Sequence, residues 1–374
     1  MFVLIFTINV VFFRSNGLSI SQITLLDIIW ALVAFFLEVP TGALADRWSR
    51  KYTLALSGLF TAFGMFLYAV SSKFFPFALA STLMAARNAF HSGTANALVY
   101  DSLRSINKEN DFERVLGRAR FIGIVSVSIA GILGSYLAST ANIRLPFTLS
   151  IFTSLFAVLI ALSFKEPPFY RSTGEMRFFE HIKKAAKFAL INPFLRFLII
   201  YFTLTDIAIS HLDEYDQLYL NAVNFPLAFF GVWIGLRRGL SGFAALFAAK
   251  FKGIPPSRTK AAALMVMIGA LLAISFGDKY LGLLAFLIIF PIWGIMEVLI
   301  IGELHSKVES YRRATVESVI VVFAIMIDIP IRLGFGYIGD LFNIRTGYSF
   351  IAAILILYAP YFLWKSTFRF SNRF

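Results

Sequence analysis

The chain has 374 residues, of which 59% are hydrophobic and only 15% are charged, and its mean hydropathy is +0.77. A soluble domain carries about 25% charged residues, so this composition excludes a soluble globular protein. Cysteine is absent, which excludes disulfides, thiolate catalysis and cysteine-ligated metal sites, and the four histidines show no metal-ligand spacing. The net charge of +13 is weak evidence for nucleic-acid binding until its distribution is known.

Apolar residues occur in blocks of about 20, the length that an α-helix needs to cross a hydrocarbon core of about 30 Å. Such blocks, without alternating polarity, predict helices rather than a β-barrel. The first block lacks the basic start and the cleavage site of a signal peptide, so we interpret it as a short first span. Twelve spans are predicted, at residues 1–13, 22–41, 53–71, 76–101, 117–138, 146–164, 194–213, 226–249, 261–277, 280–303, 315–337 and 346–364.

The spans form two sets of six, which predicts an all-α membrane protein with two pseudo-symmetric six-helix bundles. The predicted domains are an N-terminal bundle at 1–164, a cytoplasmic linker at 165–193 and a C-terminal bundle at 194–374. Within the linker, apolar residues recur at helical spacing with lysines between them, so we expect an amphipathic helix on an anionic membrane surface. A solvated linker helix is the alternative interpretation.

Lysine and arginine are distributed unevenly between the predicted loops. The even-numbered loops, with the C-terminal tail, hold 24 of the 34 basic residues, and the opposite loops hold 5. Because basic residues collect on the cytoplasmic side, both termini are expected in the cytoplasm. The net charge therefore belongs to the inner membrane surface, and we expect lipid rather than nucleic acid as the partner.

A short repeat supports two related halves. Asn-Ile-Arg occurs at 142–144 and again at 343–345, in each case just before the last span of its half. The offset is 201 residues. Two parallel halves of six spans are the architecture of transporters that work by rocking one bundle against the other.

The loop after the second span reads GALADRWSRKYT, at residues 42–53. This sequence resembles the signature of the major facilitator superfamily between spans two and three, although Ser49 stands where the family prefers glycine. LEVPTGALAD at 37–46 and FHSGTANALVYDSL at 90–103 resemble a bacterial and archaeal subgroup of that superfamily. The matching positions of the signature are Gly42, Asp46, Arg47, Arg50 and Lys51.

The resemblance implies a conformational latch on the cytoplasmic side. In it Asp46 would face the start of span eleven near Thr315, and Arg47 or Arg50 would meet Asp101 at the end of span four. The alternative is a basic loop that only sets topology, with an Asp at the surface. The signatures of the family's drug/proton antiporters are incomplete here, because Arg87 precedes Gly93 by six positions and span five contains AGILGS without proline.

Charged residues inside the predicted spans require a functional or structural reason, because each costs about 2.5–3.5 kcal/mol at the bilayer centre. A protonatable carboxylate beside an arginine is the minimum for coupling proton movement to transport. Static ion pairs between helices are the alternative. The candidates for proton coupling are Asp206, Asp328 and Glu297, in that order. The candidates for substrate binding are Arg87, Asn88, His91, Arg237, Arg238, Arg332 and Trp293.

These features predict a secondary active transporter that works by alternating access, with proton-coupled export of small molecules as the first hypothesis. Uptake or uniport of a small organic anion is the alternative, favoured by the arginines of spans four and eight. Motifs of metalloproteases, aspartyl proteases and P-loop ATPases are missing, so we expect no enzyme activity, no cofactor and no metal. The expected setting is a monomer in the plasma membrane whose partners are lipid, a small substrate and protons.

Overall fold

The computed structural model describes residues 3–47, 49–166, 192–308 and 313–368. The described part of the chain contains twelve α-helices and no strands. Contacts divide the chain into two compact units, residues 1–176 with 225–232 and residues 177–224 with 233–374. The predicted amphipathic helix of the linker lies outside the described residues, so it stays a prediction.

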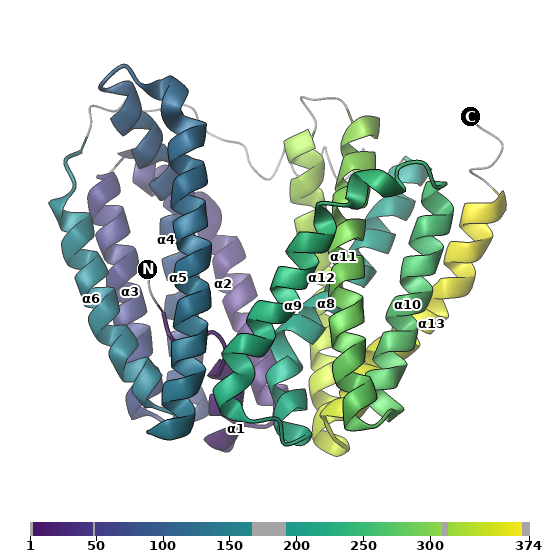
Figure 1. Ribbon diagram of the computed structural model, residues 1–374. Helices are drawn as coiled ribbons and strands as arrows, with labels where there is room; N and C mark the ends of the chain where they lie inside the picture. The colour runs from purple at the N-terminus through teal and green to yellow at the C-terminus, as the bar shows by residue number, and fades with distance from the viewer. Residues whose placement is uncertain (1–2, 48, 167–191, 309–312, 369–374) are drawn as a thin grey trace. The chain divides into compact units, whose positions relative to one another are not determined.

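The first unit contains the helices α1 to α6 (Figure 1). Their bounds are α1 Asn9–Ser15, α2 Ile20–Arg47, α3 Arg50–Val70, α4 Phe74–Arg104, α5 Phe112–Thr140 and α6 Leu145–Ser163. The helices of the second half are α8 to α13, at Pro193–Ala222, Phe230–Ala245, Pro256–Phe276, Lys279–Lys307, Arg313–Leu341 and Ile344–Phe368. The prediction of an all-α protein built from two sets of six helices is therefore confirmed.

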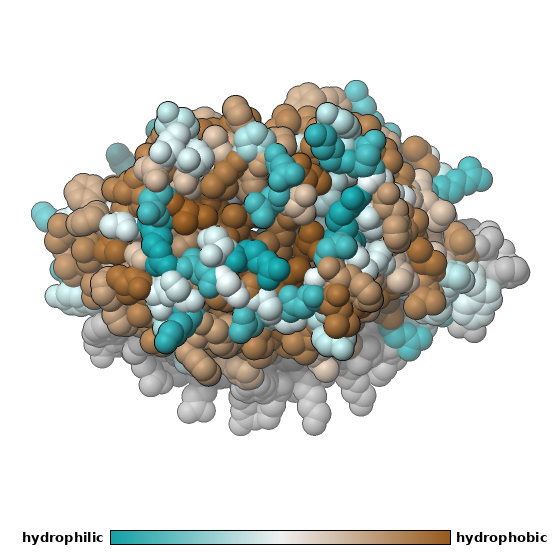
Figure 2. Space-filling model, turned by 90° about the horizontal axis from the view of Figure 1, so that it is seen from below, coloured by the Kyte–Doolittle hydropathy of each residue, from teal (hydrophilic) through white to brown (hydrophobic). Residues whose placement is uncertain are grey.

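Nine of the described helices are long and apolar enough to cross a membrane. The other three are α1 and α9, with 7 and 16 residues, and α4, which is 31 residues long but less apolar. The predicted span 1–13 differs from the structure, because residues 4–8 form turns and the helix begins at Asn9. Large hydrophobic side chains such as Phe36, Phe121 and Leu357 are exposed, and hydrophobic residues cover much of the surface in Figure 2. Such surfaces are stable in lipid.

An aromatic cluster fills the core at corresponding places in the two halves. In the first, the rings of Phe147 and Phe12 have centroids 4.1 Å apart, and Tyr68 and Phe77 pack beside them. In the second, Tyr348 stands 201 positions after Phe147, and its ring contacts those of Phe286, Tyr219 and Phe335. The repeat seen in the sequence therefore continues into the packing of each core.

The repeated arginine has the same structural role in both halves. Arg144 donates hydrogen bonds to the carbonyls of Ala69 (2.6 Å) and Ser71 (2.8 Å) at the end of α3, and to the side chain of Asn16 (2.5 Å). Arg345 donates to the carbonyls of Ile274 (3.1 Å) and Gly277 at the end of α10. The last carbonyls of a helix have no partner within the helix, and each guanidinium supplies one.

Replacing Arg144 by Gln should lower the stability of the folded protein by about 2 kcal/mol, because hydrogen bonds from a charged donor contribute about 1.5–3 kcal/mol each and are not additive. Thermal unfolding of the purified protein measures the loss. Lys73→Gln is the matched control, because Lys73 is an exposed cation in the neighbouring loop. Equal melting temperatures for the two variants would contradict the proposed capping role.

Close backbone packing holds residues 4–7 against α5. The Thr7 hydroxyl donates to the carbonyl of Gly131 on α5 (2.9 Å), and the Leu4 amide donates to the hydroxyl of Ser150 on the neighbouring helix α6 (3.1 Å). A Cβ added at Gly134 would collide with the carbonyl of Leu4. Only glycine therefore allows this segment to lie directly on α5.

Gly134→Ala should destabilise the protein by about 1–3 kcal/mol, which is the usual cost of overpacking. Gly123→Ala is the control, because a Cβ at Gly123 on the same helix meets no atom within 4 Å. Alanine also favours helix formation over glycine by about 1 kcal/mol, so the control should be neutral or slightly stabilising. The retained fraction of monodisperse protein after heating distinguishes the variants. A Gly134→Ala variant as stable as the control would show that the segment does not lie against α5.

Candidate functional site

Helix α8 carries four carboxylates, more than any other described helix of the second unit. It begins after Asn192, whose side chain accepts hydrogen bonds from the amides of Phe194 (3.0 Å) and Leu195 (3.2 Å). It continues to Ala222, nine residues beyond the predicted end of this span at 213. The longer helix holds Asp213, Glu214 and Asp216 in one rigid element together with Asp206.

Arg237 of α9 is fully buried and pairs with two carboxylates of α8. Its Nη2 atom lies 2.8 Å from Asp213 Oδ1 and 2.9 Å from Asp216 Oδ2, and both Arg237 and Asp216 are 0% exposed. The guanidinium also lies over the ring of Phe290, 3.9 Å from its centroid. Arg238 is 43% exposed and shares Asp213 at 2.5 Å. Burial of charge is tolerated only with such partners, so this group holds α8 and α9 together.

A second ionic group joins α8 to α12. Arg332 pairs with Glu214 and with Asp328, one turn before it on α12, and donates to the Tyr215 hydroxyl at 3.0 Å. His211 donates from Nδ1 to the carbonyl of Ile207 at 2.8 Å, and the same nitrogen lies 3.8 Å from Asp328. Asp328, the second proton-coupling candidate, therefore has a cationic partner within its own helix.

Asp206, the first proton-coupling candidate, differs from these carboxylates. Within the described residues it makes no hydrogen bond and no ion pair, although it is half-buried. The charged groups that act on it most strongly are the carboxylates Glu297, Asp328 and Glu214. Glu297 of α11 is exposed and likewise forms no ion pair in the part of the chain that the structure describes. Asp206 and Glu297 are thus two anions without a permanent counterion.

Aromatic side chains connect α8 and α11 one helical turn from these two carboxylates. The rings of Phe202 and Trp293 stack, with centroids 5.8 Å apart and an interplanar angle of 27°. Phe202 precedes Asp206 by four residues, and Trp293 precedes Glu297 by four, so each aromatic ring shares a helix face with a carboxylate. Trp293, predicted for substrate binding, is therefore adjacent to the candidate proton site.

The remaining substrate-binding candidates lie on α4 of the first unit. Arg87 is half-buried, and in the described ranges neither Arg87 nor Asn88 forms a hydrogen bond or ion pair. His91 lies one turn after Arg87 and interacts with its positive charge electrostatically. His91 also lines a pocket of about 720 Å³ with Ser57 and Ser126.

Two residues predicted for the latch, Arg50 and Asp101, meet at the start of α3. Arg50 forms an ion pair with Asp101 of α4 and donates to the carbonyl of Ala97 at 2.8 Å. The sequence left Arg47 or Arg50 as the partner of Asp101, and the structure has Arg50 in this place. Lys51 lies over the ring of Tyr52, 5.1 Å from its centroid. The side chains of Asp46, Arg47 and Thr315 and the surroundings of Gly42 lie outside the described set.

Several charged residues that form contacts near the candidate site were missed by the sequence interpretation. Glu166 accepts hydrogen bonds from the Ser49 hydroxyl and the Arg50 amide, so it caps the N-terminus of α3. Glu214 and Asp216 were overlooked because the span was ended at 213, although Asp213 and Asp216 have the i, i+3 spacing of one helix face. A further ion pair of Lys260 with Glu303 (2.5 Å) and a hydrogen bond between His305 and Glu317 (2.6 Å) join neighbouring helices.

The sequence profile described as Major Facilitator Superfamily matches residues 1–327. No curated protein matches the chain as a relative. A mutant of the nucleoside transporter NupG has a similar structure, with a TM-score of 0.75 and 12% identity over 96% of this chain and 94% of that chain. The unoccupied, inward-facing structure of a bacterial homologue of the human lysosomal transporter Spinster has a TM-score of 0.71 and 14% identity over 99% of this chain and 94% of that chain.

These structural neighbours share the fold, and the profile spans most of the sequence. The chain therefore belongs to the Major Facilitator Superfamily, as a multi-pass membrane protein that functions in secondary transport and not as an enzyme.

Proposed function

We propose that this transporter exports small molecules in exchange for protons. The observation that carries the proposal is the pair of carboxylates Asp206 and Glu297, which have no hydrogen bond or ion pair among the described residues and act on each other electrostatically. Two like charges at the low dielectric of a membrane protein repel strongly. One proton or one cationic substrate relieves this repulsion, and the two compete for the same carboxylates.

Competition of this kind produces antiport. When the carboxylates face the outer side, a proton binds and neutralises one of the two. When they face the cytoplasm, substrate displaces the proton and is carried out in the next cycle. Rocking of the two six-helix bundles exposes the site to one side of the membrane and then to the other. Export is driven by the difference in proton free energy between the two sides.

The latch on α3 and α4 regulates the cytoplasmic side in this proposal. Arg50, Asp101 and Glu166 hold the start of α3 to the end of α4 and to the segment after α6. We expect the predicted partners Asp46 and Arg47 to complete the latch. The unequal distribution of Lys and Arg supports cytoplasmic termini in a plasma membrane.

Asp101→Asn should slow transport with little effect on substrate affinity, because it removes the carboxylate that pairs with Arg50 and leaves the carboxylates of α8 and α11 unchanged. A reduction of about tenfold in maximal rate corresponds to about 1.4 kcal/mol of lost differential stabilisation. Initial rates in proteoliposomes measure it, with Glu109→Gln, in the exposed turn after α4, as control. A transport rate of Asp101→Asn equal to that of the wild type would show that the Arg50–Asp101 ion pair does not control transport.

One observation favours uptake or uniport of a small organic anion as a second candidate. Arg87 lies within α4 and has no ion-pair partner in the described chain, so it is available to an anion. Arg237 supports this alternative less, because its guanidinium already pairs with Asp213 and Asp216.

Flux into proteoliposomes under an imposed pH gradient distinguishes the candidates. The substrate is first found by a thermal-shift screen of small organic cations and anions, because a ligand of the folded state raises apparent stability by mass action. Movement of the substrate against the proton flow supports antiport. Movement with the protons indicates symport, and indifference to the gradient indicates uniport.

A further inference from the structure

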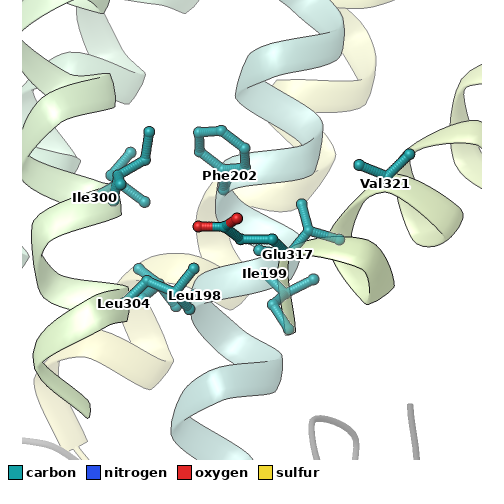
Figure 3. A pocket seen from close by; sticks show the side chains of 9 residues that line it. Leu198, Ile199, Phe202, Ile300, Leu304, Glu317 and Val321 are labelled. Carbon is teal, nitrogen blue, oxygen red and sulfur yellow. The ribbon is translucent and has the colours of Figure 1, made fainter. Parts of the chain in front are cut away.

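A pocket of about 200 Å³ lies between α8, α11 and α12 of the second unit, and its lining is almost entirely apolar. Figure 3 shows the single charged side chain, Glu317, directing its carboxylate into the space between Phe202, Ile300 and Leu198. Its lining includes Leu198, Ile199 and Phe202 of α8, Ile300 and Leu304 of α11, and Glu317 of α12. The mechanism described above does not use this pocket.

The carboxylate of Glu317 has capacity for a further partner. Its Oε1 atom lies 2.6 Å from Nε2 of His305, and its other oxygen forms no hydrogen bond with any residue that the structure describes. The side chain is 54% exposed, so a ligand can reach it. An anion placed at the edge of an apolar pocket attracts a cation whose body is hydrophobic and repels an anion of the same shape.

Size and ring chemistry limit the ligand further. A volume of about 200 Å³ is below the roughly 300–1,000 Å³ of pockets that hold drug-sized molecules. The pocket therefore suits one aromatic ring or a short branched alkyl group. The ring of Phe202 adds a surface that favours a cation over a neutral group.

The position of the pocket connects it with transport. Phe202 lies four residues before Asp206 on α8, and Ile300 lies three residues after Glu297 on α11, so the pocket is about one helical turn from the two unpaired carboxylates. The positive charge of a cation bound here favours the ionised form of the nearby carboxylates over the protonated form. The pocket and the proton site can thus act in one exchange.

We propose that this pocket holds the apolar body of a small organic monocation while Glu317 binds its charge, which makes compact hydrophobic ammonium ions the substrate class. The inference rests on the proposed export function for its physiological meaning, but its binding test does not require transport.

Isothermal titration of the full chain in lipid nanodiscs with benzyltrimethylammonium tests the inference. Glu317→Gln should weaken binding at least about tenfold, because hydrogen-bonded and ionic contacts to a charged group are among the strongest in a site. Val321→Trp should abolish binding by filling the pocket from its exposed rim. The controls are Glu109→Gln in an exposed turn and Met326→Trp at an exposed position of α12, and both should bind as the wild type does.

Three results would overturn the inference: no binding by the wild type at millimolar concentration, unchanged affinity in Glu317→Gln, or equal binding of phenylacetate. Melting curves show whether each variant is folded, and the rim variant keeps the test valid if the charge variant is unstable. If Glu317→Gln loses cation binding but the wild type exchanges no protons, the proposed export function is wrong and the proposed binding site stands. If the wild type exchanges protons but Glu317→Gln binds the cation unchanged, the proposed cation site is wrong and the export function stands.

Discussion

Asp206→Asn should abolish proton-driven accumulation of substrate while leaving exchange of substrate for substrate intact. Asn has the shape of Asp but cannot gain or lose a proton, so the carrier would cycle only when substrate occupies the site on both sides. The measurement compares two assays in the same proteoliposomes, accumulation under a pH gradient and counterflow without one. Ser210→Ala, one turn later on α8, is the control and should behave like the wild type in both assays.

The two assays together distinguish a loss of proton coupling from a loss of the folded protein. A variant that is merely unfolded loses both activities, whereas a variant that has lost its proton carrier loses only the first. If Asp206→Asn accumulates substrate at the wild-type rate under a pH gradient, Asp206 is not the proton carrier and another residue has this role. Glu297→Gln is the next variant in that case, because Glu297 is the other carboxylate without an ion pair in the described chain.

Arg237→Met should lower the stability of the folded protein by about 3–5 kcal/mol, because breaking a buried ion pair leaves an uncompensated buried charge. Here two carboxylates, Asp213 and Asp216, lose their common partner. Arg238→Met is the matched control. It is the adjacent arginine, shares Asp213 and is 43% exposed, so its loss should cost about 1 kcal/mol or less. Denaturation of the purified protein in detergent measures both variants.

A second substitution separates lost charge pairing from lost packing. Asp216→Leu combined with Arg237→Met replaces the fully buried pair by apolar side chains, and such replacements are often neutral or stabilising. The double variant should therefore be more stable than Arg237→Met alone. A double variant less stable than the single one would mean that Asp216 stabilises this core through contacts other than its ion pair with Arg237, such as its hydrogen bond with the backbone of Gln217.

The fold was predictable from the sequence because lipid imposes a simple rule on helix length. Blocks of about 20 apolar residues indicated twelve helices, and the Asn-Ile-Arg repeat indicated two related halves. The structure gives this repeat a physical reason, since Arg144 and Arg345 cap α3 and α10. Helix ends were less predictable: α8 continues to Ala222 because its acidic residues find cationic partners inside the bundle.

The candidate site was predictable as a set of residues but not as a set of pairs. The sequence shows Asp206, Asp328, Arg237 and Arg332 as charges within spans, but it does not show which carboxylate each arginine meets. Partner choice depends on helix rotation and on residues such as Glu214 and Asp216 that lie beyond the hydropathy signal. The pairing is what separates Asp206 from the other carboxylates, so its distinct character emerges only from the three-dimensional arrangement.

Proton movement driven by substrate tests the central claim most directly. Vesicles containing the wild-type protein and a trapped pH-sensitive dye receive external substrate without any initial pH gradient. Exchange of protons for substrate predicts that the vesicle interior becomes more alkaline as substrate enters, and that Asp206→Asn vesicles show no change. An interior that acidifies, or stays constant while substrate enters the wild-type vesicles, would contradict the account.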